Sequence, residues 1–205
     1  MTVSARTLAL SVFFLCLAPT VAQAQDAAAA PVQALDDGLL SIMKGGKALG
    51  FAGRSAKIGP VVDRVFDLPL MTRLAVGPAW TALAPADKDA VTAAFRRMTI
   101  AQYAENFDGF TGESFTIDPK AEVRAGDRLV RTMLKSPKND PVALAYRLRQ
   151  TGEQWKVIDV FYQNSISQLA TRRSDFAAAL AKGGAKGGAK ALVAHLDQLS
   201  AKAAH

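Results

Sequence analysis

Few side chains in this sequence carry the chemistry that catalysis usually needs. The two histidines, His195 and His205, stand near the C-terminal end, and the single cysteine is Cys16. No serine stands in a Gly-x-Ser-x-Gly turn, and no His/Glu/His spacing offers a zinc site. We therefore expect no catalytic residue, no metal site and no cofactor.

Three charged residues remain as candidates for a site. Asp159, inside the apolar run WKVIDVFY, is either a buried carboxylate that acts as a base or a hydrogen-bond acceptor near a strand end. Arg172 and Arg173 are candidates for holding an anionic head group or a docking partner, because guanidinium groups bind phosphate and carboxylate well. The alternative for both arginines is a solvated helix face.

An export signal precedes these candidates. After one basic residue, the apolar run LALSVFFLCLA (residues 8–18) leads to VAQA, whose small residues fit a signal-peptidase site. The apolar run is too short to span a bilayer. We predict a signal peptide over residues 1–24, cut after Ala24, followed by a flexible leader over 25–32 and a periplasmic location.

Helical periodicity dominates residues 33–110. Asp67 fits the N-cap position of one helix, and Pro85 fits the first position of a long one. After Pro85, apolar residues recur at three- and four-residue steps, which predicts a broad apolar face.

Strand periodicity replaces helical periodicity between residues 112 and 162. Four short segments alternate or are rich in β-formers, and turn residues separate them: 113–118, 128–134, 142–149 and 155–162. Consecutive strands with short connections predict a four-stranded antiparallel sheet with one face available for helices.

The last part of the chain, residues 166–202, is again helical in pattern. Two Ala-rich amphipathic segments, 166–181 and 189–202, flank the tandem KGGAKGGA. A phosphate-binding glycine loop follows a buried strand, whereas this tandem follows a helix. We interpret it as a flexible linker.

Composition limits the classes of partner. Half of the residues are hydrophobic, so a chain of 205 residues can form a substantial core, and one cysteine excludes a disulfide framework. Aromatic residues are only 7%, which leaves few platforms for stacking bases, so we expect no nucleic-acid partner. The formal charge is +7, or +6 without Arg6 of the predicted signal peptide, and it fits transient docking to anionic membrane surfaces or to acidic faces of a partner.

These segments predict an α+β fold with a single domain over residues 33–205. The four-stranded sheet packs against the mainly helical N-terminal half and the C-terminal helices, with an apolar cavity between them. The candidate cavity residues, each of which could equally be plain core, are Phe66, Leu70, Met71, Leu74, Trp80, Phe95, Met98, Tyr103, Phe107, Leu144, Tyr146, Leu148, Ile158, Val160 and Tyr162.

An ordered set of short motifs resembles one family over nearly the whole chain. The set comprises FDLPLM (66–71), GPAW (77–80), FRR (95–97), FTGE (110–113) and WKVIDV (155–160). It resembles the MlaC family, also described as toluene-tolerance or phospholipid-binding auxiliary proteins. The segment SISQLATRRSDF (165–176) looks closer to HpnM, the branch associated with hopanoid biosynthesis.

The resemblance implies a soluble periplasmic carrier of phospholipid or hopanoid that takes part in outer-membrane lipid homeostasis. Such a carrier encloses the lipid tails and shuttles the lipid between an inner-membrane lipid transporter and an outer-membrane lipid complex. It implies no enzyme activity, and we expect a monomer. Two alternatives stay open at this point: a non-catalytic adaptor of a membrane lipid transporter, or a cone-shaped α+β enzyme with Asp159 as base.

Overall fold

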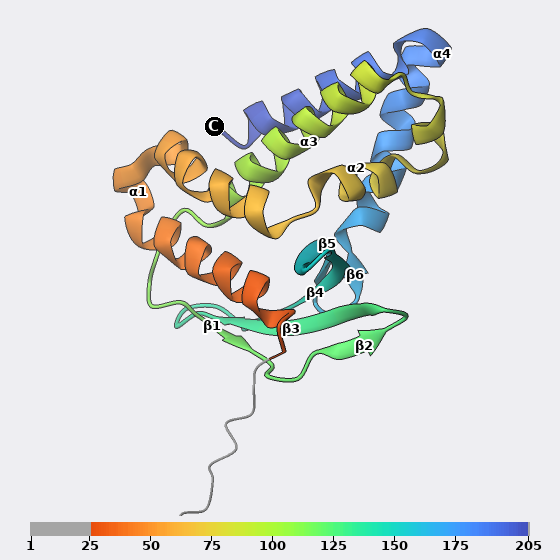
Figure 1. The fold of residues 1–205 in the computed structure, drawn as a ribbon. Helices are drawn as coiled ribbons and strands as arrows, with labels where there is room; N and C mark the ends of the chain where they lie inside the picture. The colour runs from red at the N-terminus through yellow and green to blue at the C-terminus, as the bar shows by residue number, and fades with distance from the viewer. Residues whose placement is uncertain (1–25, 205) are drawn as a thin grey trace, which may run out of the picture.

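A computed structural model describes residues 26–204 and shows a layer of helices above an antiparallel sheet (Figure 1). The α+β class is therefore confirmed. The predicted signal peptide lies outside the described residues. In chain order the helices are α1 (Ala29–Val65), α2 (Leu68–Val76), the 3-10 helix η1 (Gly77–Ala82), α3 (Pro85–Asn106) and α4 (Gln168–Lys202).

The sheet has six strands, so the expectation of four was too low. They are β1 (Ser114–Ile117), β2 (Glu122–Arg124), β3 (Asp127–Lys135), β4 (Val142–Thr151), β5 (Gln154–Tyr162) and β6 (Ile166–Ser167). The order is β1-β3-β4-β5-β6, and β2 also pairs with β3. The two additional strands, β2 and β6, contain three and two residues. Segments this short cannot display a two-residue period.

Helix α1 consists of two arms that fold back on each other. Gly46 and Gly50 have positive φ angles of 45° and 59° inside it, a conformation that costs glycine little. The first arm lies over the sheet, and the second returns above it (Figure 1). The prediction of a flexible leader is wrong from Ala29 onward, because Ala29 and Val32 are buried in the helix–sheet core.

Two predicted helix starts are confirmed. The Asp67 side chain accepts a hydrogen bond from the Leu70 N–H at 3.0 Å, and α3 begins at Pro85. Just before α2, the Asp67 N–H donates to the Val157 carbonyl on β5 at 2.9 Å, which fixes the start of α2 to the sheet. The expected helical stretch to residue 110 is wrong at its end, because α3 stops at Asn106 and Phe110 is 41% exposed.

The glycine tandem in α4 forms a sharp corner and not a flexible linker. Gly184 has a φ of 62°, and the chain turns there between two helical arms. A Cβ on Gly183 would lie 2.7 Å from the Gly188 nitrogen, so only glycine allows this approach. Across the corner, His195 Nε2 lies 2.9 Å from an Asp175 oxygen. The second arm runs beside α3 (Figure 1), where Arg97 pairs with Asp197.

Candidate functional site

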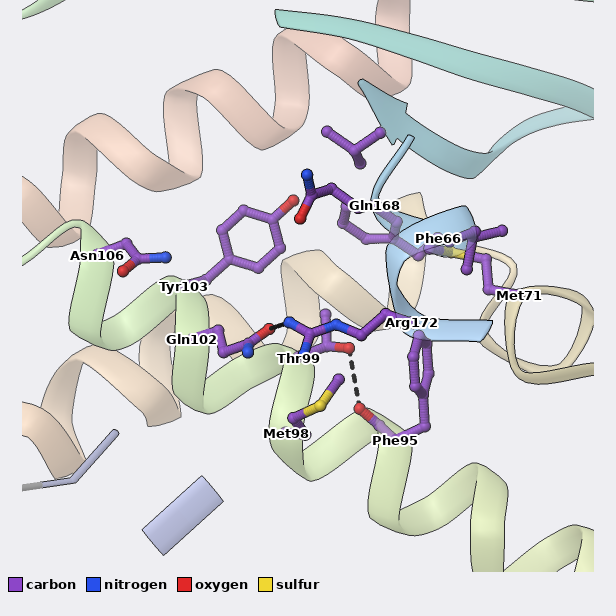
Figure 2. Close-up of a pocket in the computed structure, with 12 residues that line it drawn as sticks. Phe66, Met71, Phe95, Met98, Thr99, Gln102, Tyr103, Asn106, Gln168 and Arg172 are labelled. Carbon is purple, nitrogen blue, oxygen red and sulfur yellow. Dashed lines mark hydrogen bonds between the residues drawn. The ribbon is translucent and has the colours of Figure 1, made fainter. Parts of the chain in front are cut away.

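A cavity of about 180 Å³ lies where α2, α3 and the start of α4 meet β5. Figure 2 shows its side chains pointing toward one another from these elements. The lining residues are Phe66, Met71, Phe95, Met98, Thr99, Gln102, Tyr103, Asn106, Val160, Gln168, Leu169 and Arg172.

The twelve lining residues divide equally by type, and we call the two sets the apolar half and the polar half. The apolar half comprises Phe66, Met71, Phe95, Met98, Val160 and Leu169, and the polar half comprises Thr99, Gln102, Tyr103, Asn106, Gln168 and Arg172. Mostly apolar walls with a few convergent polar groups are typical of small-molecule sites. This wall suits a ligand that is itself amphipathic.

Arg172 is the one cation in the lining. Within the described part of the chain, its side chain makes a single hydrogen bond, from Nη2 to the Gln102 Oε1 at 2.8 Å, and no salt bridge. Burial lowers the pKa of the guanidinium, and the charge of Asp175 opposes this shift. A guanidinium has five N–H donors, so the half-buried Arg172 retains capacity for an anionic group.

Arg173 takes a different direction. Its Nη2 and Nε donate to the Leu74 carbonyl at 3.0 and 3.3 Å, near the C-terminal end of α2. A cation in that position stabilises the helix end. The structure therefore separates the two arginines that the sequence analysis paired: Arg172 reaches the cavity, whereas Arg173 holds α2 against α4.

A row of aromatic rings continues from the cavity along the interface between helices and sheet. The ring centroids of Phe66 and Tyr103 are 5.8 Å apart, those of Tyr103 and Phe107 are 6.0 Å apart, and those of Phe107 and Phe115 are 6.5 Å apart. These spacings are typical of favourable aromatic pairs. Apolar surface thus extends beyond the cavity toward β1.

Six of the fifteen candidate cavity residues line the cavity: Phe66, Met71, Phe95, Met98, Tyr103 and Val160. Tyr146 and Leu148 are fully buried in the core, and Ile158 is fully buried within the sheet. Four more candidates pack against the core: Leu74, Trp80, Phe107 and Leu144. Leu70 lies on α2 outside the lining, and Tyr162 is 43% exposed.

The sequence analysis missed the polar half of the lining apart from Tyr103 and Arg172. Four polar lining residues lie on α3: Thr99, Gln102, Tyr103 and Asn106. They continue the face of Phe95 and Met98 at three- and four-residue steps. The helical period was therefore a usable signal. Selecting only apolar residues on that face hid it.

Asp159 has a positioning role. Its oxygens accept hydrogen bonds from the Ser167 hydroxyl at 2.6 Å and from the backbone N–H groups of Val160 and Leu169 at 2.8 and 3.2 Å. These contacts fix the first turn of α4 against β5. Gln168, Leu169 and Arg172 extend from that turn into the cavity.

Residues 26–204 contain no group of His, Cys, Asp and Glu side chains arranged to hold a metal ion. None of the helices formed by these residues combines the length and apolar character that crossing a membrane requires.

Known proteins provide an independent comparison. The family model described as MlaC protein matches residues 33–198. The fold is similar to the solved structure of a phospholipid-binding protein from Ralstonia solanacearum in complex with a phospholipid, with a TM-score of 0.70 and 27% sequence identity. That match covers 87% of this chain and 99% of the other. None of the curated proteins matches the sequence.

Proposed function

The chain belongs to the MlaC family, and from this premise we propose that it binds and carries a lipid. The observation that carries the proposal is the cavity, in which apolar side chains from α2, α3 and β5 are joined by a half-buried arginine that has spare hydrogen-bond donors. The phospholipid held by the similar protein from Ralstonia solanacearum supports this assignment.

Physical chemistry explains why a lipid needs such a protein. Each methylene group exposed to water costs about 0.8 kcal/mol, so a lipid with long tails leaves a membrane only when something else encloses them. A carrier meets this need with binding energy alone and requires no catalytic residue. We therefore propose a non-enzymatic role.

In the proposed complex, Arg172 and Gln102 bind the head group and the apolar half of the lining contacts the tails. The guanidinium already donates to Gln102, which orients its remaining N–H groups. Arg173 contributes indirectly, because its bond to the Leu74 carbonyl keeps α2 beside α4.

Loading requires the cavity to widen. Its volume of about 180 Å³ is below the roughly 300–1,000 Å³ of typical ligand pockets, so only part of a lipid fits this conformation. We propose that α2 moves relative to the sheet. One hinge lies near Phe66, where the start of α2 is hydrogen-bonded to β5, and the other lies at Gly77, whose φ is 70°.

A cross-link tests this motion. Cysteines replacing Met71 and Val160, joined by a short thiol cross-linker, should block lipid uptake, whereas uptake at the uncross-linked rate would exclude this motion.

We place the protein in the periplasm after removal of the predicted signal peptide. There it would pass lipid between an inner-membrane transporter and an outer-membrane complex, as a monomer that touches membrane surfaces briefly. The full chain has a formal charge of +7, and removal of Arg6 with the predicted signal peptide leaves +6, which supports transient association with anionic surfaces. Phospholipid and hopanoid are the two cargo classes that we propose.

Native purification from an envelope that contains both lipid classes tests the function. Organic extraction and mass spectrometry of the wild-type protein should yield stoichiometric lipid. Arg172→Gln should retain about tenfold less anionic phospholipid, whereas Arg73→Gln, the matched control on the exposed face of α2, should retain the wild-type amount. Recovery of no lipid, with no affinity for labelled lipid, would favour the adaptor role.

A further inference from the structure

One side chain in the helix–sheet core does not match its surroundings. The inward face of the first arm of α1 is formed by Val32, Leu35, Leu39 and Ile42, all fully buried, and Asp36 shares this face at the same helical spacing. The exposed fraction of Asp36 is 0%. Its neighbour Asp37 is exposed and accepts a hydrogen bond from Gln33 at 2.9 Å.

The Asp36 carboxyl lacks the partners that burial normally demands. Neither of its oxygens has a hydrogen-bond partner within residues 26–204. Most buried polar groups are hydrogen-bonded, because leaving one unsatisfied costs stability. Burial, assisted by the nearby charge of Asp37, raises the pKa of Asp36 to about 8. At neutral pH the group is therefore mainly a neutral acid, which can both donate and accept a hydrogen bond.

The charge of Asp36 acts on two phenols in the helix–sheet interior, the partly buried Tyr103 of α3 and the fully buried Tyr146 of β4. Burial raises the pKa of Tyr103, and the charge of Asp36 adds to the shift. Burial also raises the pKa of Tyr146, with further contributions from Tyr103 and then Asp36. We call these three residues, Asp36, Tyr103 and Tyr146, the inner polar cluster.

Tyr103 connects the inner polar cluster to the cavity. Tyr103 and Gln168 both line the cavity, and in Figure 2 the hydroxyl end of Tyr103 points toward the Gln168 side chain. A phenol can accept a hydrogen bond from one neighbour while it donates to another. It can therefore transmit a hydrogen bond from the Asp36 acid to a group inside the cavity.

Resting on the proposed carrier function, we propose that the inner polar cluster binds a hydroxyl group carried on the apolar part of the ligand. In the bound state Asp36 donates to Tyr103, and Tyr103 donates to the ligand hydroxyl at the Gln168 end of the cavity. A plain hydrocarbon chain offers nothing to these groups. The ligand class is therefore a lipid with a neutral hydroxyl on its buried portion, such as a hydroxylated acyl chain or a triterpenoid alcohol.

Matched pairs of lipids that differ by one hydroxyl test this inference. The pairs are a hydroxystearic acid against stearic acid and diplopterol against diploptene, each measured by displacement of a fluorescent fatty acid from the full chain. Wild type should bind the hydroxylated member of at least one pair about tenfold more tightly. The pair that shows the preference identifies the source of the hydroxyl.

Three variants assign the preference to Asp36. Asp36→Leu, which has nearly the same shape, should remove the preference while plain stearic acid or diploptene still binds. Asp36→Asn should keep part of it, because an amide also donates and accepts. Asp37→Asn is the matched control on the exposed face and should behave as wild type. Thermal unfolding verifies that each variant is folded.

The outcomes separate the inference from the carrier function. Equal wild-type affinity within both pairs, or a preference that persists in Asp36→Leu, would overturn the hydroxyl site while lipid binding itself stands. If none of the four lipids binds and no lipid copurifies, the carrier function fails and the hydroxyl site fails with it.

Discussion

Two aspartates are buried in different parts of this molecule, one without a hydrogen-bond partner among the described residues and one with arginine partners. Asp36, between α1 and the sheet, is 0% exposed among apolar residues. Asp127, at the start of β3, is 2% exposed and accepts hydrogen bonds from Arg147 Nε at 2.6 Å and from Arg149 Nε and Nη2 at 2.8 and 2.9 Å. The pKa of Asp36 is raised to about 8, whereas hydrogen bonding to Arg149 lowers the pKa of Asp127.

The contrast shows what a buried carboxylate can be used for. Asp127 follows the tight Ala125-Gly126 turn and ties β3 to β4, the strand that carries both arginines. Its charge is compensated inside the fold, so its role is structural. The Asp36 carboxyl has no such compensation from the described residues, and in the proposed hydroxyl site it acts on the ligand through Tyr103. The hydrogen-bond and ion-pair partners of a buried carboxylate, more than its burial, therefore indicate whether it is structural or a candidate binding group.

The largest expected effect is a dependence of stability on pH that comes from Asp36. Its folded-state pKa is raised from 3.8 to about 8, so the folded protein keeps a proton that the unfolded chain has lost. The free energy of unfolding should therefore fall as the pH rises through this window, by about 1.4 kcal/mol per pH unit. Urea unfolding of Asp36→Asn should lack this decline. Parallel profiles for variant and wild type would show that Asp36 is charged or accessible in the folded protein.

Asp127 should give a pH dependence of the opposite sign and a substantial loss on deletion. Because its folded-state pKa is lowered, its stabilisation is present above pH 3.8 and disappears in acid. Asp127→Ala should lower the free energy of unfolding by about 2–3 kcal/mol, a value reduced because both arginines are partly exposed. Asp140→Ala, in an exposed loop, is the control and should change it by less than about 0.5 kcal/mol. Equal small effects would remove the distinction between the two buried acids.

Much of the fold could be predicted because its signals are local. The Asp67 cap, the Pro85 helix start and the four longer strands each depend on residues a few positions apart. The corner at Gly184 could not be predicted in this way. In the sequence, two glycine pairs are typical of a flexible linker. In the structure, they let the two helical arms of α4 approach closely.

The site was less predictable than the fold for the same reason. Periodicity identifies which face of α3 points inward, but it does not show whether a gap or another side chain meets that face. The helical period places Asp36 on the inward face of α1 and Asp37 off it, so the sequence could indicate which acid points inward. It could not show that the Asp36 carboxyl is fully buried without a hydrogen-bond partner from the described residues, or that Tyr103 and Tyr146 come near it.

Asp159, a third buried acid, should show the smallest effect and thereby sharpens the comparison. It is 8% exposed and, like Asp127, has partners, but these are neutral: the Ser167 hydroxyl and backbone N–H groups. Asp159→Asn should therefore cost about 1 kcal/mol of stability, similar to the loss of a helix cap, because the amide oxygen still accepts one of these bonds. Ser167→Ala, which removes both the N-cap acceptor and this partner, should cost a similar amount.

Neither variant, Asp159→Asn or Ser167→Ala, should alter the wild-type preference within the lipid pairs, because the contacts of Asp159 and Ser167 position the start of α4 without touching the inner polar cluster. Loss of lipid binding in Asp159→Asn at unchanged stability would instead mean that this carboxylate acts on the site, by contact with the ligand or through the turn that carries Gln168 and Arg172. The presence of hydrogen-bond partners would then no longer distinguish structural from binding acids.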